Sequence, residues 1–242
     1  MVEFEAAHLP CEQGNQPVLV VVMAAFDEAE TIGAVVRALP GEVEGHRVEA
    51  VVVDDGSTDD TACVAAQAGA LVVRHAVNRG QGAALRTGFT FAHGRGADVV
   101  VTMDADGQHR PEDLPALVRP IVEGDADYVQ GSRFLGAYDD SGSTRELGIR
   151  VLTLVVNAAS RAGITDCANG FRAVRADRLG ELVLFEDRFS ASEIIIEAAR
   201  RRLRIVEVPV HVRARTHGES KKPRSLRYPL GFLRVVLRVW WR

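Results

Sequence analysis

The chain has 242 residues, of which 47% are hydrophobic, and a formal net charge of −4, so it can bury the core of one large domain. Cys11, Cys63 and Cys167 are odd in number and lack the paired spacing of a zinc site. This pattern excludes a disulfide framework and indicates reduced, intracellular thiols. From residue 200 onward, Lys and Arg far outnumber the acidic residues, which makes the rest of the chain acidic. No nucleic-acid partner is expected.

Residues 1–17 lack the basic start and long apolar stretch of a signal peptide, and we expect a flexible lead-in there. After it, short apolar strands alternate with Ala-rich helical patterns, which predicts βαβ units and a mostly parallel sheet. The predicted strands are Val18–Ala24, Val48–Asp55, Ala70–His75 and Ala97–Asp106. The predicted helices cover 27–40, 58–68 and 80–94. We therefore expect one Rossmann-like α/β domain over residues 18–225, followed by a helix over 226–242.

Polar residues follow three of these strands, in Phe26–Glu28, Asp54–Ser57 and Asp104–Gln108. In parallel sheets, ligands bind outside the carboxyl ends of the strands. Each loop alone also fits a helix start, where Asp and Ser cap free amides and an acid such as Glu28 complements the helix dipole. Three acidic loops at one edge would repel one another unless they met hydrogen-bond donors or cations. Their combination favours a binding site.

Asp104 and Asp106 stand at alternate positions where a buried strand ends. With a period of two, both carboxylates can point the same way, which is costly unless a cation lies between them. Oxygen ligands of this kind select Mg²⁺ or Mn²⁺, and the Gln108 amide oxygen is a candidate third ligand. Hard-cation sites seldom use imidazole, so His109 is interpreted as a bystander or an acceptor-side polar group. The alternative is a solvated loop.

Eight motifs follow one another in a fixed order, namely AAFDEAETI, VVVDDGSTDDT, NRGQGAALRTG, MDADGQHRP, GSRF, DCANGFRA, EVPV and RTHGESK. Together they resemble the family-two inverting glycosyltransferases of GT-A fold, in the branch of dolichyl-phosphate mannose synthases and polyprenyl-phosphate hexosyltransferases. The resemblance spans residues 18–221. It implies transfer of a hexose from a nucleotide-diphospho-sugar, either GDP-mannose or a UDP-sugar, to a polyprenyl phosphate.

The resemblance assigns Arg133 and Arg215 to phosphate groups, where a forked guanidinium binds well, and lets Ser220 and Lys221 close over the donor. The expected catalytic set consists of Asp104, Asp106, Arg133, Arg215 and Lys221. Gly82 opens a helix, either for backbone approach to a ligand or as part of a tight turn. The expected donor-binding residues are Ala25, Phe26, Glu28, Asp54, Asp55, Gly56, Arg79, Gly82, Asp104, Ala105, Asp106, Arg133, Arg215, Ser220 and Lys221.

Two features depart from the family pattern. The first loop usually carries Pro, Tyr and Asn before its Glu, whereas Ala25, Phe26 and Asp27 precede Glu28 here. Many bacterial relatives continue into transmembrane helices, and the apolar runs of this chain fall short of the roughly 20 residues that span a bilayer. We therefore expect a peripheral protein at the cytoplasmic face of the membrane, with a homo-oligomer left open.

The acceptor decides whether a general base is needed. A phosphate monoester has its second pKa near 6 and is already a nucleophile at neutral pH. An amphipathic helix over 143–163 and the loop after it would form the acceptor side, with Arg145, Asn157, Asp166 and Arg172. For a sugar-hydroxyl acceptor, the candidate base would be Glu193, which also fits a helix-start acid. A sugar nucleotidyltransferase and a non-catalytic sugar-nucleotide sensor are the alternatives outside this family.

The tail from residue 225 predicts a helix with Arg227, Arg234, Arg238 and Arg242 in one stripe and apolar side chains over much of the rest. Arg beside Trp on such a helix is typical of an interface with anionic lipid. A helix docked on the sheet or in a dimer contact is the alternative.

Overall fold

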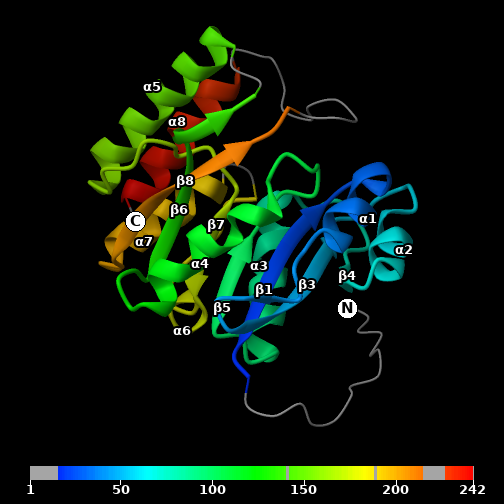
Figure 1. Cartoon of the computed structure of the whole chain (residues 1–242). Helices are drawn as coiled ribbons and strands as arrows, with labels where there is room; N and C mark the ends of the chain where they lie inside the picture. Colours follow the sequence, from blue (N-terminus) through cyan, green and yellow to red (C-terminus); the bar gives the residue numbers. More distant parts are fainter. Residues whose placement is uncertain (1–15, 140–141, 188–189, 215–226, 242) are drawn as a thin grey trace.

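The computed structural model describes residues 16–139, 142–187, 190–214 and 227–241. Within these residues, one sheet of eight strands has the order β2-β3-β1-β5-β7-β6-β8, and β4 pairs with β3 (Figure 1). The strands are β1 (Val18–Ala25), β2 (Glu42–Val43), β3 (His46–Asp54), β4 (Leu71–Arg74), β5 (Val99–Thr102), β6 (Tyr128–Tyr138), β7 (Arg172–Arg175) and β8 (Ile205–Val212). The four strands predicted from the sequence correspond to β1, β3, β4 and β5. The fourth is shorter than predicted, because β5 ends at Thr102 and Asp104 and Asp106 lie in the turn after it, not in the strand.

The helices alternate with these strands, as the sequence predicts for the first half of the chain. They are α1 (Ala29–Arg37), α2 (Thr61–Gln67), α3 (Gln81–Gly94), α4 (Leu114–Val122), α5 (Ser143–Ser160), α6 (Ala176–Leu179), α7 (Ser190–Arg200) and α8 (Arg227–Trp241), with a short 3₁₀ turn at Pro111–Asp113. No helix in the described residues is long and apolar enough to cross a bilayer. Cys63 and Cys167 are free thiols, and Cys11 lies outside the described residues.

The sheet is mixed, with a parallel half and an antiparallel insertion. β1 pairs in parallel with both β3 and β5, and β3 pairs in parallel with β4. β7 is antiparallel to β5 and to β6, and β6 pairs in parallel with β8. The parallel half carries the three predicted acidic loops at its carboxyl edge, and β7 brings a second set of loops beside them. The mostly parallel sheet expected from the sequence is therefore present with two reversed strands, β7 and the short β2, which pairs antiparallel to β3.

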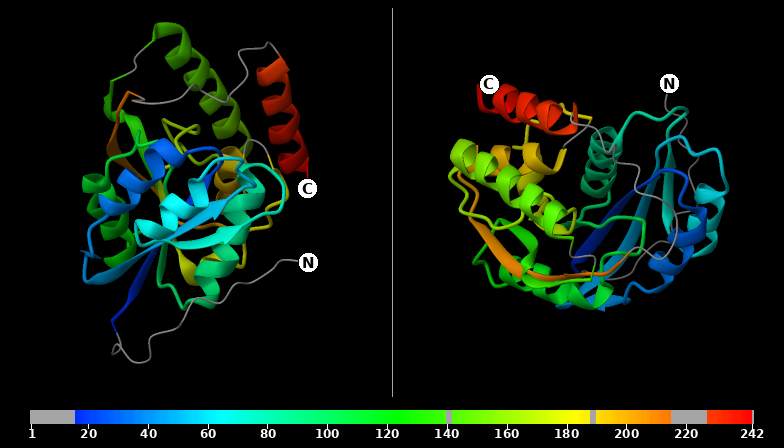
Figure 2. Two further views of the ribbon diagram at one scale, coloured as in Figure 1. Left: turned by 90° about the vertical axis from the view of Figure 1, so that its right-hand side faces the viewer. Right: turned by 90° about the horizontal axis from the view of Figure 1, so that it is seen from above.

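Helices cover both faces of the curled sheet (Figure 2). On one face, α3, α5, α7 and α8 pack over Val20, Val22 and Tyr128. On the other, α1, α2 and α4 pack over Leu19 and Val21. Because successive side chains of a strand point to opposite faces, burial on both sides requires the unbroken apolar runs seen in β1 and β5.

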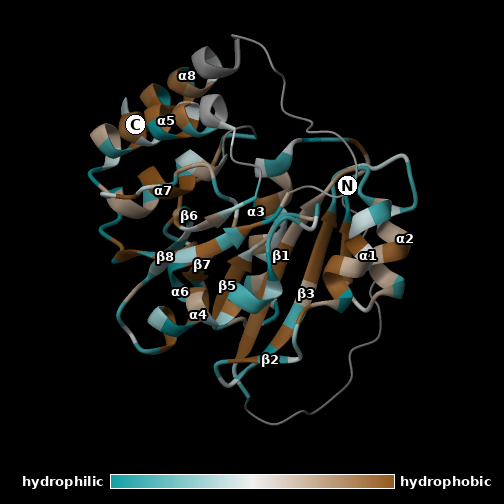
Figure 3. Cartoon of the chain, turned by 45° about the horizontal axis from the view of Figure 1, so that its top comes forward, coloured by the Kyte–Doolittle hydropathy of each residue, from teal (hydrophilic) through white to brown (hydrophobic). Residues whose placement is uncertain are grey.

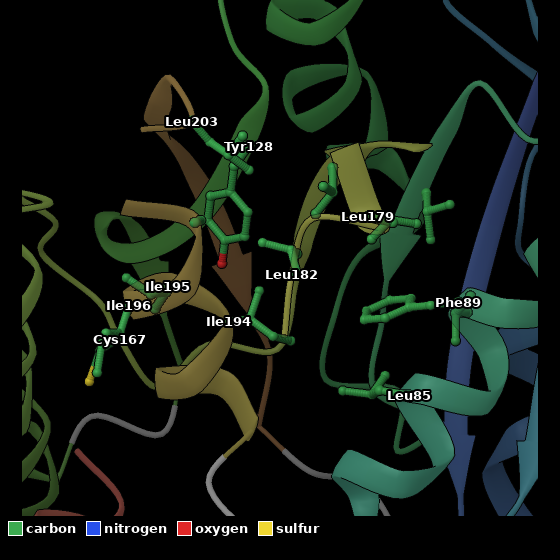
Figure 4. Close-up of a cluster of buried hydrophobic side chains, with 14 of the residues drawn as sticks. Leu85, Phe89, Tyr128, Cys167, Leu179, Leu182, Ile194, Ile195, Ile196 and Leu203 are labelled. Atoms are coloured by element: carbon green, nitrogen blue, oxygen red, sulfur yellow. The ribbon is translucent and has the colours of Figure 1, made fainter. Parts of the chain in front are cut away.

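The core under α3 and α7 includes aliphatic side chains from both helices (Figure 4). Leu85 and Phe89 of α3 and Ile194 of α7 belong to it, together with Tyr128 from the sheet. Burial raises the pKa of Tyr128 to about 12, and its hydroxyl donates to Gln130 Oε1 at 2.7 Å. This core fixes α7 against the strands and so positions the loop that precedes it.

Helix α8 docks on α5 and α7 by one of its faces. Phe232, Val236 and Val239 are buried in the core, and the Arg200 guanidinium of α7 donates to the Val239 carbonyl at 2.7 Å. On the outer face Trp241 remains 84% exposed. The apolar colouring of both α5 and α8 is visible in Figure 3. One face of the tail helix is therefore docked on the domain, as one interpretation expected, and the other face is exposed among the described residues.

Asp127 joins β6 to its neighbours through a charge network. Its carboxylate accepts hydrogen bonds from Arg204, from Nη2 at 3.0 Å and from Nε at 3.1 Å, and Arg175 lies at 3.4 Å. Hydrogen bonding from Arg204 lowers the pKa of Asp127 from its ordinary value to about 2. The carboxyl group is therefore ionised in the folded protein well below the pH at which it is protonated in the unfolded chain.

We expect Asp127→Asn to lower the free energy of unfolding by about 1–2 kcal/mol at pH 7, after allowance for the partial exposure of both arginines. Because the folded-state pKa is depressed, this stabilisation is present above pH 4 and is lost as the pH falls towards 2. Denaturant unfolding of both proteins between pH 7 and pH 2 measures the difference. Asp177→Asn, which removes an exposed partner of Arg175, should stay within about 0.5 kcal/mol of wild type. A constant difference at all pH values would contradict the assignment.

Candidate active site

The structure brings the three acidic loops together at one edge of the sheet. Ala25 pairs with Asp54 across β1 and β3, so the loops after these strands start side by side. Asp27 N donates to Ser57 Oγ at 2.9 Å between those loops. Thr31 Oγ1 of α1 donates to the Ala105 carbonyl at 2.9 Å, which ties the third loop to the first. The convergence inferred from the sequence is therefore present, and β5 carries its third member.

Asp104 is the accessible carboxylate of the loop after β5, with a side chain 34% exposed. Gln81 Nε2 of α3 donates to its Oδ1 at 3.3 Å. A Cβ at position 170 would lie 2.6 Å from that oxygen, so the glycine found there leaves the room that the carboxylate needs. Asp106 is more buried, and its Oδ1 accepts the Gln108 backbone amide at 3.0 Å. Both carboxylates thus belong to one tightly folded turn.

The His109 side chain fixes the position of that turn through hydrogen bonds. Its Nδ1 accepts the Asp104 backbone amide at 3.1 Å, and its Nε2 lies 2.9 Å from Asn169 Oδ1. This pair of partners requires the neutral tautomer with the proton on Nε2. The buried ring stacks on Phe171 at 4.9 Å. Both ring nitrogens are therefore used within the protein, and the interpretation of His109 as a bystander or an acceptor-side polar group stays a prediction.

Gln108 connects the same turn to the end of β8. Its side-chain Nε2 donates to the Arg213 carbonyl at 2.9 Å, and Arg213 N donates back to the Gln108 carbonyl at 2.8 Å. The side-chain amide oxygen of Gln108 is a hydrogen-bond acceptor. Its role as a third metal ligand stays a prediction. Across the described residues, no group of three or more His, Cys, Asp or Glu side chains is arranged to hold a metal ion. A two-carboxylate site is the kind that Mg²⁺ completes with substrate phosphates and water.

Asp54 and Asp55 shape the second loop with their carboxylates. Asp54 is fully buried, and its Oδ1 accepts the Ser57 amide at 2.9 Å. Asp55 accepts the backbone amides of Arg79 at 3.0 Å and Gly80 at 2.7 Å, and it lies 2.7 Å from His75 Nδ1. Asp55 thereby ties the loop containing Gly56 to the loop before α3. Their predicted contact with a nucleoside stays a prediction.

Gly82 serves a close backbone contact. A Cβ there would lie 2.0 Å from the Glu186 carbonyl oxygen, and Gly82 N donates to the Asp187 carbonyl at 3.0 Å. This close packing against the segment before α7 was not among the interpretations of the glycine, and its predicted approach to a ligand stays a prediction. The neighbouring Arg79 uses its backbone amide on Asp55 and keeps an exposed side chain.

The first loop meets the second through Glu28. Its backbone amide donates to Thr61 Oγ1 at 2.8 Å, and its carboxylate lies 3.1 Å from Thr31 Oγ1. Phe26 beside it is half-buried. These contacts place the loop at the edge of the site, where the sequence predicts contacts to the base or ribose.

Arg133 and Asp166 form one buried pair, although the sequence analysis placed them on the donor and acceptor sides respectively. Arg133 Nε donates to Asp166 Oδ2 at 2.6 Å, and its guanidinium lies 5.1 Å from the centre of the Tyr138 ring. The Asp166 backbone amide donates to Glu207 Oε1 at 3.1 Å, and burial raises the pKa of the Glu207 carboxyl. The predicted phosphate ligand and the predicted acceptor loop are thus one structural unit.

The side chains of Glu193 and Asn157 form hydrogen bonds with backbone groups. Glu193 is fully buried and accepts the amides of Phe185 and Glu186, each at 2.9 Å. Asn157 donates to the Ile164 carbonyl at 2.7 Å and accepts the Ile164 amide at 3.0 Å. Both fix loops around the site. The remaining predicted site residues, the side chain of Arg145 and all of Arg215, Ser220 and Lys221, lie outside the described residues.

Asp104 and Gln81, which are hydrogen-bonded to each other, both line a pocket on the face of the sheet that α3, α5, α7 and α8 cover. Its wall combines polar and apolar side chains, among them Arg172, Cys167, Leu152 and Phe232. Burial raises the pKa of Cys167 to about 11, so its thiol is neutral. An elongated ligand with a charged end and an apolar end matches this lining.

Sequence reasoning did not find the buried partners that position these groups. Asn169, which orients His109, stands unremarked inside the motif DCANGFRA. His75, which bonds to Asp55 and to Thr87 at 2.9 Å, follows a strand without any motif. One feature of the sequence could have indicated Asn169, because it lies in the motif that also supplies Asp166 and Arg172.

Comparisons with known proteins find relatives over most of the chain. The undecaprenyl-phosphate mannosyltransferase of Micrococcus luteus is 33% identical over 84% of this chain and 86% of its own length. The UDP-N-acetylglucosamine–dolichyl-phosphate N-acetylglucosaminyltransferase of Methanococcus voltae is 29% identical over 88% of this chain and 91% of its own. Glucosyl-3-phosphoglycerate synthase of Mycobacterium tuberculosis, solved with Mn²⁺, UDP-glucose and phosphoglyceric acid, superposes with a TM-score of 0.68 at 26% identity, covering 92% of this chain and 78% of its own.

The GT-A fold expected from the sequence is confirmed by that structural neighbour. The family description "Glycosyl transferase family 2" matches residues 20–182, which is more than half of the chain. The chain is therefore a member of glycosyl transferase family 2, and its enzyme class is that of a glycosyltransferase.

Proposed function

We propose that the protein is a metal-dependent inverting transferase that moves a hexose from a nucleotide-diphospho-sugar to polyprenyl phosphate at the cytoplasmic surface of the membrane. The observation that carries the proposal is the pocket that joins the Asp104 carboxylate to an interior lined by both a guanidinium and apolar side chains. The Micrococcus luteus and Methanococcus voltae relatives are named for the transfer of different sugars, to undecaprenyl phosphate and dolichyl phosphate respectively. Both GDP-mannose and UDP-sugars therefore remain candidate donors.

Asp104 and Asp106 would hold the divalent ion, Mg²⁺ or Mn²⁺, with the Gln108 amide oxygen as third ligand. The donor set fits, because carboxylate and amide oxygens suit hard cations and the Asp104 side chain is accessible. When bound, such an ion stabilises the negative charge that develops on a leaving diphosphate. Arg133, Arg215, Ser220 and Lys221 would contribute further donors to the phosphates, and the loops around Glu28 and Asp54 would hold the nucleoside.

The acceptor phosphate supplies its own nucleophile. One of its oxygens forms the new bond to the sugar C1 while the bond from C1 to the nucleoside diphosphate breaks, and that electron pair leaves with the diphosphate. A phosphate monoester is largely ionised at neutral pH, so no protein base is required. Glu193, the candidate base for a sugar-hydroxyl acceptor, is fully buried with two backbone amides on its carboxylate. Its burial favours the phosphate acceptor over the hydroxyl acceptor.

The membrane part of the proposal rests on two neighbouring helices. α5 exposes Leu147, Val151 and Leu154, and α8 exposes Leu237 and Trp241. The same helices contribute Leu152 and Phe232 to the pocket wall. A lipid surface against their outer faces would therefore present an acceptor directly to the pocket. Arg234, which is exposed on α8, adds the positive charge that anionic lipid attracts.

A donor panel tests the proposal. Purified protein with Mn²⁺ or Mg²⁺, a lipid extract and each of several GDP- and UDP-sugars should release a nucleoside diphosphate and form a glycosyl phospholipid with one donor at a rate at least tenfold above the others. Product analysis by mass spectrometry identifies both. Transfer to a soluble hydroxyl acceptor with none to polyprenyl phosphate would overturn the acceptor assignment, and release of pyrophosphate from a nucleoside triphosphate would overturn the reaction type.

A further inference from the structure

Arg172, at the start of β7, is a deeply buried cation. Its side chain is 2% exposed, and its two terminal nitrogens donate to backbone carbonyls, Nη1 to Ala191 at 3.1 Å and Nη2 to Asn169 at 2.5 Å. Nε is buried without a hydrogen-bond partner. Among the described residues, no carboxylate lies within ion-pair distance of this guanidinium. Two carbonyl dipoles therefore stabilise a full charge that has no counter-ion.

Other arginines of the protein show how unusual this arrangement is. Arg133, which is also buried, has Asp166 at 2.6 Å, and Arg204 and Arg175 share Asp127. An unpaired charge in a protein interior is costly, whereas a charge with an anion beside it is compensated. The position of Arg172 is consistent with a counter-ion that arrives with a ligand.

The pocket beside Arg172 has the chemistry to receive such a ligand. Arg172 lines it together with Ser190 and Ser192 at the start of α7, which contribute hydroxyl groups. Asp104 lines the same pocket, so a cation held there would add positive charge to it. An anion between these two positive groups would be attracted by both, because a low-dielectric site strengthens each interaction.

The remaining wall is apolar. Leu152 of α5 and Phe232 of α8 line the pocket, and the opposite faces of the same helices expose Leu154 and Trp241 to solvent. An anionic group near Arg172 could therefore continue into a hydrocarbon chain that passes these two side chains. Inorganic phosphate would satisfy the charge but leave the apolar wall without a partner.

We propose that Arg172 binds the phosphate group of an isoprenyl phosphate acceptor, with Ser190 and Ser192 as further donors and with Leu152 and Phe232 against the first part of the hydrocarbon chain. The assignment rests on the proposed function, since it specifies where that acceptor lies. It makes Arg172, rather than the Asp166-paired Arg133, the residue on which acceptor affinity depends most.

Steady-state kinetics with a short-chain, water-soluble isoprenyl phosphate tests the assignment without a membrane. Arg172→Gln should raise the KM for this acceptor at least tenfold and change the KM for the sugar nucleotide less than twofold. Arg172→Lys keeps the positive charge but lacks the forked guanidinium, so its acceptor KM should lie between those of the wild type and Arg172→Gln. Arg175→Gln is the matched control from the same strand, since its guanidinium pairs with Asp177 and Asp127 away from the pocket, and it should leave both constants unchanged.

Two further measurements keep the test decisive. Ser192→Ala, which leaves Arg172 in place, should raise the acceptor KM about threefold even if Arg172→Gln does not fold. Inorganic phosphate should raise the melting temperature of the wild type but not that of Arg172→Lys or Ser192→Ala to the same extent. Unchanged acceptor KM and unchanged phosphate stabilisation in folded variants would overturn the assignment. Absence of any transfer by the wild type would overturn the proposed function, whereas the phosphate measurement would still decide whether Arg172 binds an anion.

Discussion

Replacing Asp106 by alanine is expected to lower the transfer rate by on the order of a thousandfold while the protein stays folded. A metal ion that stabilises a leaving diphosphate lowers the barrier by several kcal/mol, and each 1.4 kcal/mol is about tenfold in rate. Asp106 lies at the carboxyl edge beside Asp104, and its Oδ1 accepts the Gln108 backbone amide at 3.0 Å. Nucleoside diphosphate release, measured with saturating donor and acceptor, gives the rate.

Control experiments distinguish the loss of the metal ion from the loss of the folded structure. Asp98→Asn changes a carboxylate at the opposite end of β5, where Asp98 Oδ2 accepts the Val18 amide at 2.7 Å, and it should retain most of the activity. A chelator should abolish wild-type turnover, and excess Mn²⁺ or Mg²⁺ should restore it. Direct titration of Mn²⁺ by electron paramagnetic resonance should show weaker binding to Asp106→Ala. A chelator-resistant wild type, or a variant within tenfold of it, would disprove the metal assignment.

Local patterns were enough to predict the parallel half of the sheet. β1, β5 and the second half of β3 are Val-rich runs buried on both faces, and an acidic loop follows each strand. Such runs depend only on the residues inside the strand, so a single sequence displays them. β7 shows the limit. It has four residues, begins with a buried arginine and runs antiparallel between β5 and β6, which only the long-range pairing of the sheet defines.

The candidate site follows the same division. The positions of Asp104 and Asp106 could be inferred because a strand ends beside them, but their supports come from distant segments. His109 acts through Asn169, which is 60 positions away, and Arg133 is paired with Asp166, 33 positions away. A hydrogen bond between side chains so far apart leaves no periodic signal in one sequence. The same holds for Arg172, whose buried Nε has no hydrogen-bond partner in the described part of the chain, a feature that is visible only in three dimensions.

The tail helix shows how a correct pattern can support two structures. Its apolar residues cover most of its circumference, and the sequence cannot say which of them face protein. The structure assigns Phe232, Val236 and Val239 to the core and leaves Leu237 and Trp241 outside. Deleting the whole helix would therefore expose part of the core, so a truncated chain cannot separate a membrane role from a structural one. Substitutions confined to the outer face can.

Replacing Leu237, Trp240 and Trp241 together by serine is expected to weaken binding to anionic vesicles about 100-fold. Each side chain is more than half exposed in the protein and would bury apolar area in the lipid interface, for a combined loss of about 3 kcal/mol. Vesicle sedimentation measures the binding. Because the docked face is untouched, the melting temperature should change little, and transfer to a short, water-soluble isoprenyl phosphate should be retained while transfer to a long-chain acceptor in vesicles falls.

The location of the changed residues can be tested separately from their hydrophobicity. Val77 and Val122 are also exposed, but they lie in the loop before α3 and at the end of α4, away from α5 and α8. Serine at both positions should leave vesicle binding within twofold of wild type. Equal losses in the two variants would indicate non-specific adsorption of exposed apolar groups. Undiminished vesicle binding after the change in α8 would refute a membrane role for its outer face. The acceptor would then have to reach the pocket, which Leu152 of α5 and Phe232 of α8 line, from solution.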